Sequence, residues 1–265
     1  MKRRIIITCL LLCLLALACL CVSASADSSV TLADSVFYDE GYTIVTWSVD
    51  GAAPSKMYLV YEQIADDGGT HPMLSYGEVS GTRCSTVDLL PGKRYRVTLL
   101  DEAFSELSSK EYRIPEPALF EDGKLKHSSI KVTITPRRMK AGGNTSKDAK
   151  KVKSFNAQEM IDGINGGVYA YGLKFQMKMP QLKKQRTFFV TVYIEDPDGF
   201  AMAAAAQDIE FARVNHGYQT IWFELLGQRY FEAELKKKET IPAGQYKVHL
   251  FWDGMTVGVY TFNVR

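Results

Sequence analysis

Short alternating segments separated by turn residues constrain the fold of this chain more than any other feature of its sequence. In Tyr42–Asp50, the residues Thr43, Val45 and Trp47 share one face of an extended strand, because strand side chains alternate with a period of two. Met57–Ile64 is rich in aromatic and β-branched residues, and more short segments follow at a spacing typical of β-sandwiches. We therefore predict an antiparallel sandwich over residues 27–115.

The segment LLPGKRYRV, residues 89–97, has a Pro-Gly pair just ahead of a tyrosine. Pro91 presets φ and Gly92 tolerates a positive φ, so the chain can turn sharply before the strand that contains Tyr95. This corner resembles one in fibronectin type III domains. The resemblance implies that the tyrosine hydroxyl hydrogen-bonds to the connecting backbone and that the ring packs on the core. It includes Trp47, which we expect to anchor the core.

The rest of the chain, residues 116–265, shows a second set of strand patterns after a proline-containing linker. Near its end, Pro242, Gly244 and Tyr246 form another corner, and this end resembles the last two strands of immunoglobulin-like domains. One short helix is expected after Asn156. We predict an all-β fold of two tandem β-sandwich domains, fibronectin type III-like over 27–115 and immunoglobulin-like over 116–265, after a signal peptide at 1–26.

The N-terminus predicts secretion. Three basic residues precede an apolar run and the sequence Ala24-Ser25-Ala26, which indicates signal cleavage after Ala26. The alternatives are an uncleaved anchor and lipidation at Cys19 or Cys21, but no positive flank follows the run and the residues before Cys19 match a lipidation signal poorly. Cleavage leaves Cys84 as the one cysteine, which we expect to be buried on a strand; pairing between chains and a reactive thiol are the alternatives. We expect no internal disulfide, no stable membrane insertion and an extracellular location.

The two predicted domains differ in charge. Residues 27–115 hold 7 basic and 14 acidic residues, whereas residues 116–265 hold 22 basic and 16 acidic residues. The basic excess lies in a predicted loop, Pro136–Lys153. Its seven cations are Arg137, Arg138, Lys140, Lys147, Lys150, Lys151 and Lys153.

Such a charge density can attract anionic polymers. For a secreted protein we expect an anionic polysaccharide or wall polymer, or another surface protein, rather than nucleic acid. A solvated loop without a partner is the alternative. The opposite charges of the two domains also predict weak self-association that moderate salt abolishes.

Trp222 is the second candidate contact residue. In QTIWFELL, Ile221 and Phe223 share a face that fits a core, so Trp222 is expected to point outward. An exposed indole can stack on a sugar ring or on a partner protein. The alternative is that a loop or the neighbouring domain covers it.

Motifs for catalysis or metal binding are absent from the sequence. The four histidines, at positions 71, 127, 216 and 249, have no ligand spacing, and we interpret each as incidental. Glu195, Asp196 and Asp198 are interpreted as a hairpin turn, with a calcium site as the alternative. We expect no catalytic residue, metal or cofactor. The predicted function is a secreted, non-catalytic binding or adhesion protein; the alternatives are a glycan-active hydrolase and a structural subunit of an extracellular assembly.

Overall fold

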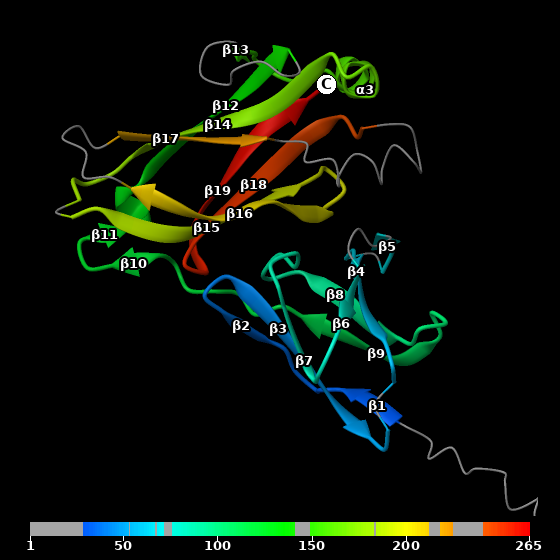
Figure 1. Ribbon diagram of the computed structural model, residues 1–265. Coiled ribbons are helices and arrows are strands. Elements are labelled where there is room, and N and C mark those ends of the chain that lie inside the picture. The colour runs from blue at the N-terminus through cyan, green and yellow to red at the C-terminus, as the bar shows by residue number, and fades with distance from the viewer. Residues whose placement is uncertain are drawn as a thin grey trace, which may run out of the picture.

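The protein is all-β and consists of two tandem β-sandwiches (Figure 1). The computed structural model describes residues 29–52, 54–66, 68–71, 76–140, 149–182, 184–211, 218–224 and 241–265. Within these ranges no helix has the length and apolar content needed to cross a bilayer.

The first sandwich has two antiparallel sheets. One has the order β1-β3-β2, with β7 also paired to β3, and the other has the order β5-β4-β8-β9, with β6 paired to β4. The strands are β1 (Ser29–Leu32), β2 (Phe37–Asp39), β3 (Tyr42–Asp50), β4 (Met57–Ile64), β5 (Thr70–His71), β6 (Tyr76–Val79), β7 (Arg83–Thr86), β8 (Arg94–Leu100) and β9 (Glu106–Arg113). Their inner faces bury a core that contains Trp47, as expected, while Cys84 on β7 is half-buried and free.

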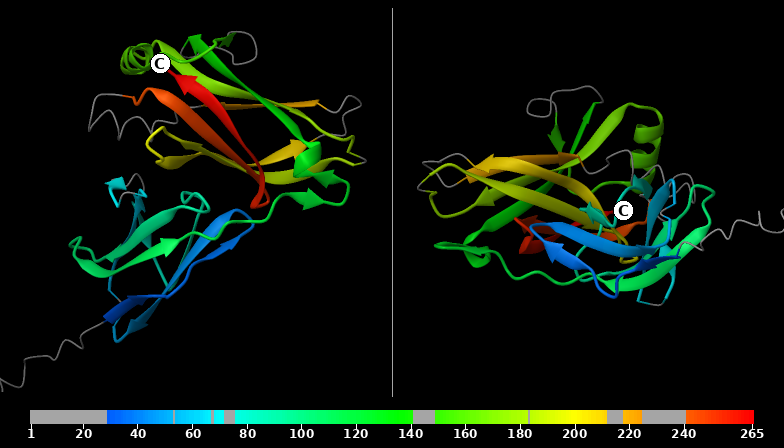
Figure 2. Two further views of the ribbon diagram at one scale, coloured as in Figure 1. Left: turned by 180° about the vertical axis from the view of Figure 1, so that it is seen from behind. Right: turned by 60° about the horizontal axis from the view of Figure 1, so that its bottom comes forward.

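The second sandwich packs the sheet β13-β12-β14-β17 against the sheet β16-β15-β18-β19 (Figure 2). A separate two-stranded ribbon, β10-β11, precedes them. The elements are β10 (Glu121–Asp122), β11 (Leu125–Lys126), the 3-10 helix η1 (His127–Ser129), β12 (Lys131–Lys140), β13 (Lys150–Lys151), α3 (Ala157–Asn165), β14 (Tyr169–Lys178), β15 (Arg186–Glu195), β16 (Ala201–Phe211), β17 (Tyr218–Glu224), β18 (Gly244–Trp252) and β19 (Met255–Val264).

Both predicted tyrosine corners are confirmed. The Leu90 N–H donates to the Tyr95 hydroxyl at 2.9 Å, and Gly92 adopts φ +82° at the bend. The Tyr246 hydroxyl donates to the Pro242 carbonyl at 2.8 Å. Both rings are buried, so each corner ties a turn to a core. The helix is confirmed as well: the Asn156 side chain caps α3 by accepting the Glu159 N–H at 2.9 Å.

The linker between the domains is anchored in the second core. Phe120 is fully buried and packs edge-on against Trp252 and Phe188. The Thr256 backbone donates to the Ala118 carbonyl and accepts the Phe120 N–H. The end of the linker therefore belongs to the second sandwich.

The predicted loop Pro136–Lys153 is wrong near both of its ends, which are occupied by strands. Residues 136–140 continue β12, which pairs with β14, and β13 then pairs with Arg137 and Arg138. Pro136 has no N–H to donate, but it precedes the residues that pair with β13, and its carbonyl accepts the Val152 N–H at 3.0 Å. Residues 141–148 lie outside the described ranges.

Candidate functional site

An apolar contact joins the two sandwiches. The side chains of Leu90 from the first domain and of Tyr193 and Phe251 from the second are buried together beside Ala201. The adjacent Leu89 lies instead in the core of the first domain, so consecutive leucines serve two different cores. This explains the unusual Leu-Leu pair ahead of Pro91.

Two glycine turns make a second contact between the domains. A Cβ atom added to Gly254 would lie 2.4 Å from the backbone nitrogen of Gly41, and both glycines have positive φ. The two turns can approach this closely only because Gly254 has no side chain, while a Cβ atom added to Gly41 would lie 3.0 Å from the Phe189 ring. Beside them the Tyr42 and Phe189 rings stack at 5.0 Å.

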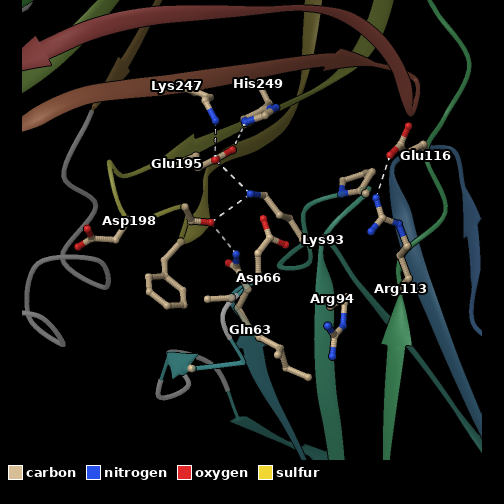
Figure 3. Close-up of a pocket in the computed structure, with 17 residues that line it drawn as sticks. Gln63, Asp66, Lys93, Arg94, Arg113, Glu116, Glu195, Asp198, Lys247 and His249 are labelled. Carbon is tan, nitrogen blue, oxygen red and sulfur yellow. Dashed lines mark hydrogen bonds and ion pairs between the residues drawn. The ribbon is translucent and has the colours of Figure 1, made fainter.

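We call the region in which the two domains contact each other, around Leu90, Gly254 and Phe189, the junction. A polar groove of about 680 Å³ lies along the junction and is lined by both domains (Figure 3). Its most buried ionisable group is the Glu195 side chain, which is 3% exposed. One carboxylate oxygen accepts hydrogen bonds from Lys93 Nζ at 3.0 Å and Lys247 Nζ at 2.9 Å, and the other is 2.7 Å from His249 Nε2. Burial by itself raises the pKa of Glu195, but these hydrogen bonds outweigh it and hold the pKa at about 2.

Gln63 holds the turn between β15 and β16. Its amide nitrogen donates to the Gly199 carbonyl at 2.8 Å and its amide oxygen accepts the Ala201 N–H at 2.9 Å. Lys93 adds a donor to the same Gly199 carbonyl at 3.2 Å. Side chains of the first domain thus satisfy backbone groups of the second, which fixes the angle between the two domains.

Sequence reasoning did not find this cluster, in which His249 is half-buried rather than solvent-facing. Lys93, Glu195 and His249 are far apart in sequence and share no motif. The interpretation of Glu195–Asp198 as a turn holds for its second half, where the Asp196 carboxylate accepts the Asp198 and Phe200 N–H groups at 2.9 Å. Across the described ranges, no group of three or more His, Cys, Asp or Glu side chains is placed to hold a metal ion.

The stabilisation from Glu195 is expected to be lost only in strongly acid solution. Its folded pKa, about 2, lies below its ordinary value of 4.5, so its contribution is complete above pH 4.5 and disappears as the pH falls towards 2. Glu195→Gln should therefore give an unfolding free energy that falls less steeply than that of the parent below about pH 5. Urea unfolding across a pH series measures this, with the exposed Glu78→Gln as the control. Parallel pH profiles for the parent and Glu195→Gln would contradict the assignment.

The predicted cationic residues divide between two faces of the sheet β13-β12-β14-β17. In the register, Arg137 is opposite Lys151, Lys131 is opposite Lys178, and Thr135 is opposite Lys174. Residues directly opposite each other share a face, and the alternate positions Val132 and Ile134 pack on the core. We call the outer side of this sheet the cationic face. Its charged members are Lys131, Arg137, Lys151, Lys174 and Lys178.

The other predicted cations lie away from this face or outside the described residues. Arg138 forms an ion pair with Glu159 and lies 4.8 Å from the centre of the Tyr169 ring. Lys150 is opposite Arg138, Lys140 ends β12, and Lys153 follows β13; all three are exposed. Lys147 is outside the described residues.

Trp222 is placed only by the backbone pairing of its strand. It lies on β17 directly opposite Lys174 of β14, although its side chain is outside the described part of the structure. The opposite sheet of the second sandwich carries Tyr193, Glu195 and His249, which contact the first domain. The cationic face therefore lies on the side turned away from the first domain (Figure 1).

Comparisons with known proteins identify no relative by sequence. No family model matches the chain, and no curated protein matches it. Among solved structures, the chain is similar to the FN1-FN3 domains of chicken CNTN1. That likeness has 10% sequence identity and a TM-score of 0.24, over 89% of this chain and 99% of that chain.

Proposed function

We propose that this protein is a non-catalytic binding or adhesion protein that acts outside the cell. In this proposal the second domain, an immunoglobulin-like sandwich, binds an anionic polysaccharide or wall polymer through the cationic face. The first domain, a fibronectin type III-like sandwich, acts as a spacer that the junction holds at a fixed angle.

The main support for this proposal is that cationic side chains lie directly opposite each other on neighbouring strands. Arg137 is directly opposite Lys151, and Lys131 is directly opposite Lys178. Such pairs destabilise a sheet, and a bound polyanion would relieve this repulsion by placing phosphate or sulfate groups between the strands. On this face β12, β13 and β14 include no carboxylate that could do the same, and among the described strands the register places one there, Glu224 at the end of β17.

The junction makes the binding surface rigid relative to the rest of the chain. The buried Leu90 contact, the Gln63 hydrogen bonds and the Lys93–Glu195 pair together oppose rotation of one domain on the other. A rigid spacer lowers the conformational entropy lost when a protein binds an extended polymer.

Binding of dextran sulfate, followed by isothermal titration calorimetry, tests the proposal. Lys131→Gln/Lys151→Gln/Lys174→Gln is expected to weaken binding about tenfold or more, since each of these surface cations contributes a fraction of a kcal/mol to about 1 kcal/mol. The control Lys56→Gln/Lys124→Gln/Lys184→Gln removes the same charge from other exposed positions and should bind like the parent. Affinity should also fall as NaCl rises from about 50 mM to about 500 mM.

Two results would overturn the proposal. One is equal weakening by the two triple variants, which would show that total charge rather than the cationic face controls binding. The other is hydrolysis of a glycan by the pure protein, which would favour an enzyme.

A further inference from the structure

A second exposed surface crosses the boundary between the domains. Phe37 on β2 is 59% exposed and lies directly opposite Ile44 on the outer side of its sheet. Tyr42, two residues before Ile44, is 38% exposed and stacks on the half-buried Phe189 of the second domain. Exposed aromatic side chains that line up in this way are typical of surfaces that bind a partner.

Carboxylates border these rings on both domains. Asp39 is directly opposite Tyr42, and Glu40 follows in the turn. On the second domain Asp208 is directly opposite Phe189, and Glu210 lies two residues further along β16. All four carboxylates are exposed. We call this surface the aromatic–acidic strip; its members are Phe37, Asp39, Glu40, Tyr42, Phe189, Asp208 and Glu210.

The chemistry of the strip fits a cationic partner. Ammonium and guanidinium groups bind both ring faces and carboxylates. The positions beside the rings on the outer sides of β2, β3, β15 and β16, from Phe37 to Ile44, Thr187 to Thr191 and Ala206 to Glu210, hold no lysine or arginine. The strip therefore has no cationic neighbour at these positions to neutralise it.

We propose that the strip docks the cationic face of a second copy of this chain. The two surfaces are complementary in charge. They also lie on different sides of the molecule: the strip crosses the junction, whereas the cationic face lies on the sheet turned away from the first domain. The rigid junction keeps them in these positions. One copy can thus present its strip to a neighbour while its own cationic face accepts another neighbour. Such a heterologous contact builds a head-to-tail assembly rather than a symmetric dimer.

This inference shares the cationic face with the proposed function, but it does not depend on polymer binding. Because both partners would occupy the same face, added dextran sulfate should dissociate the assembly. Variants of the strip separate the two ideas, since they leave the cationic face unchanged.

Analytical ultracentrifugation of the full secreted chain tests the assembly. At about 50 mM NaCl the weight-average mass of the parent should rise with protein concentration, and at about 500 mM NaCl it should return to that of a monomer. The strip variant Phe37→Ser/Asp208→Lys/Glu210→Lys should remain a monomer and still bind dextran sulfate. The control Phe104→Ser/Glu102→Lys/Glu106→Lys also removes one exposed phenylalanine and reverses two exposed carboxylates, at positions around the β8–β9 turn, and should associate like the parent.

Mixing two defective variants distinguishes head-to-tail docking from other arrangements. The strip variant and Lys131→Gln/Lys151→Gln/Lys174→Gln should each be monomeric alone. Mixed together, they should form a dimer and nothing larger, because one intact strip meets one intact cationic face. A monomeric parent at low salt would overturn the inference even if dextran sulfate binds. Persistent association of the lysine variant alone would also overturn it, because that result requires strip-to-strip pairing.

Discussion

Replacing Leu90 with alanine is expected to uncouple the two domains. The Leu90 side chain is 1% exposed and fills the contact between Tyr193 and Phe251, so truncation leaves a cavity at the junction. A buried leucine changed to alanine costs about 2–5 kcal/mol, depending on how far the site collapses. Here that loss falls on the contact between the domains. We expect the parent to unfold in one calorimetric transition and Leu90→Ala to unfold in two, with a larger radius of gyration from small-angle X-ray scattering.

Leu89→Ala is the matched control for this prediction. Leu89 is equally buried and adjacent in sequence, but its side chain lies in the core of the first domain. The same truncation should destabilise that domain by a similar amount and leave the radius of gyration of the folded protein unchanged. If both variants gave the same scattering profile and the same number of transitions, the assignment of Leu90 to the junction would be wrong.

The parts of the fold that sequence reasoning predicted depend on local chemistry. The alternation of Thr43, Val45 and Trp47, the Pro-Gly corner before Tyr95 and the Asn156 cap are each complete within a few residues. The predicted all-β, tandem-sandwich fold is confirmed for this reason. The alanine-rich segment before Phe211 forms the strand β16, because pairing with β15 overrides the helix propensity of alanine.

The parts that sequence reasoning missed depend on contacts between distant residues. Lys93 meets Glu195 across 102 positions, and Gln63 meets Ala201 across 138 positions, so no local pattern could indicate either contact. In the sequence, Pro136 and the cations that follow it interrupt the strand pattern, so the basic segment resembles a loop. In the structure, β14 pairs with β12 along its whole length and keeps the segment in a strand up to Lys140. The one local signal for the junction was the Leu89-Leu90 pair. The pair lies in the connection between β7 and β8, and its two buried side chains enter different clusters, Leu89 in the first core and Leu90 at the contact between the domains.

Replacing Trp252 with alanine is expected to destabilise the second domain by about 3–5 kcal/mol. Trp252 is fully buried at the centre of an aromatic cluster. It stacks on Phe188 at 4.9 Å, lies 4.9 Å from Phe211 and meets Phe120 of the linker edge-on at 5.1 Å. Its indole N–H has no hydrogen-bond partner in the described part of the structure, so the loss comes from packing alone. Trp252→Phe should therefore retain much of the stability.

The same substitution should also weaken the junction, because Trp252 leads directly into the turn that contacts the first domain. Asp253 accepts the Phe189 N–H at 2.7 Å and donates its own N–H to the Phe189 carbonyl at 2.8 Å, which fixes Gly254 against Gly41. If the indole is lost, both this turn and the linker residue Phe120 lose their support. Urea unfolding of Trp252→Ala should show an early transition of the second domain, accompanied by the increase in radius of gyration expected for Leu90→Ala. Trp47→Ala, which truncates the tryptophan of the first core, should instead lower the stability of the first domain. If Trp252→Ala unfolded early with no change in scattering before the transition, the turn at Gly254 would be held by the first domain rather than by the second core.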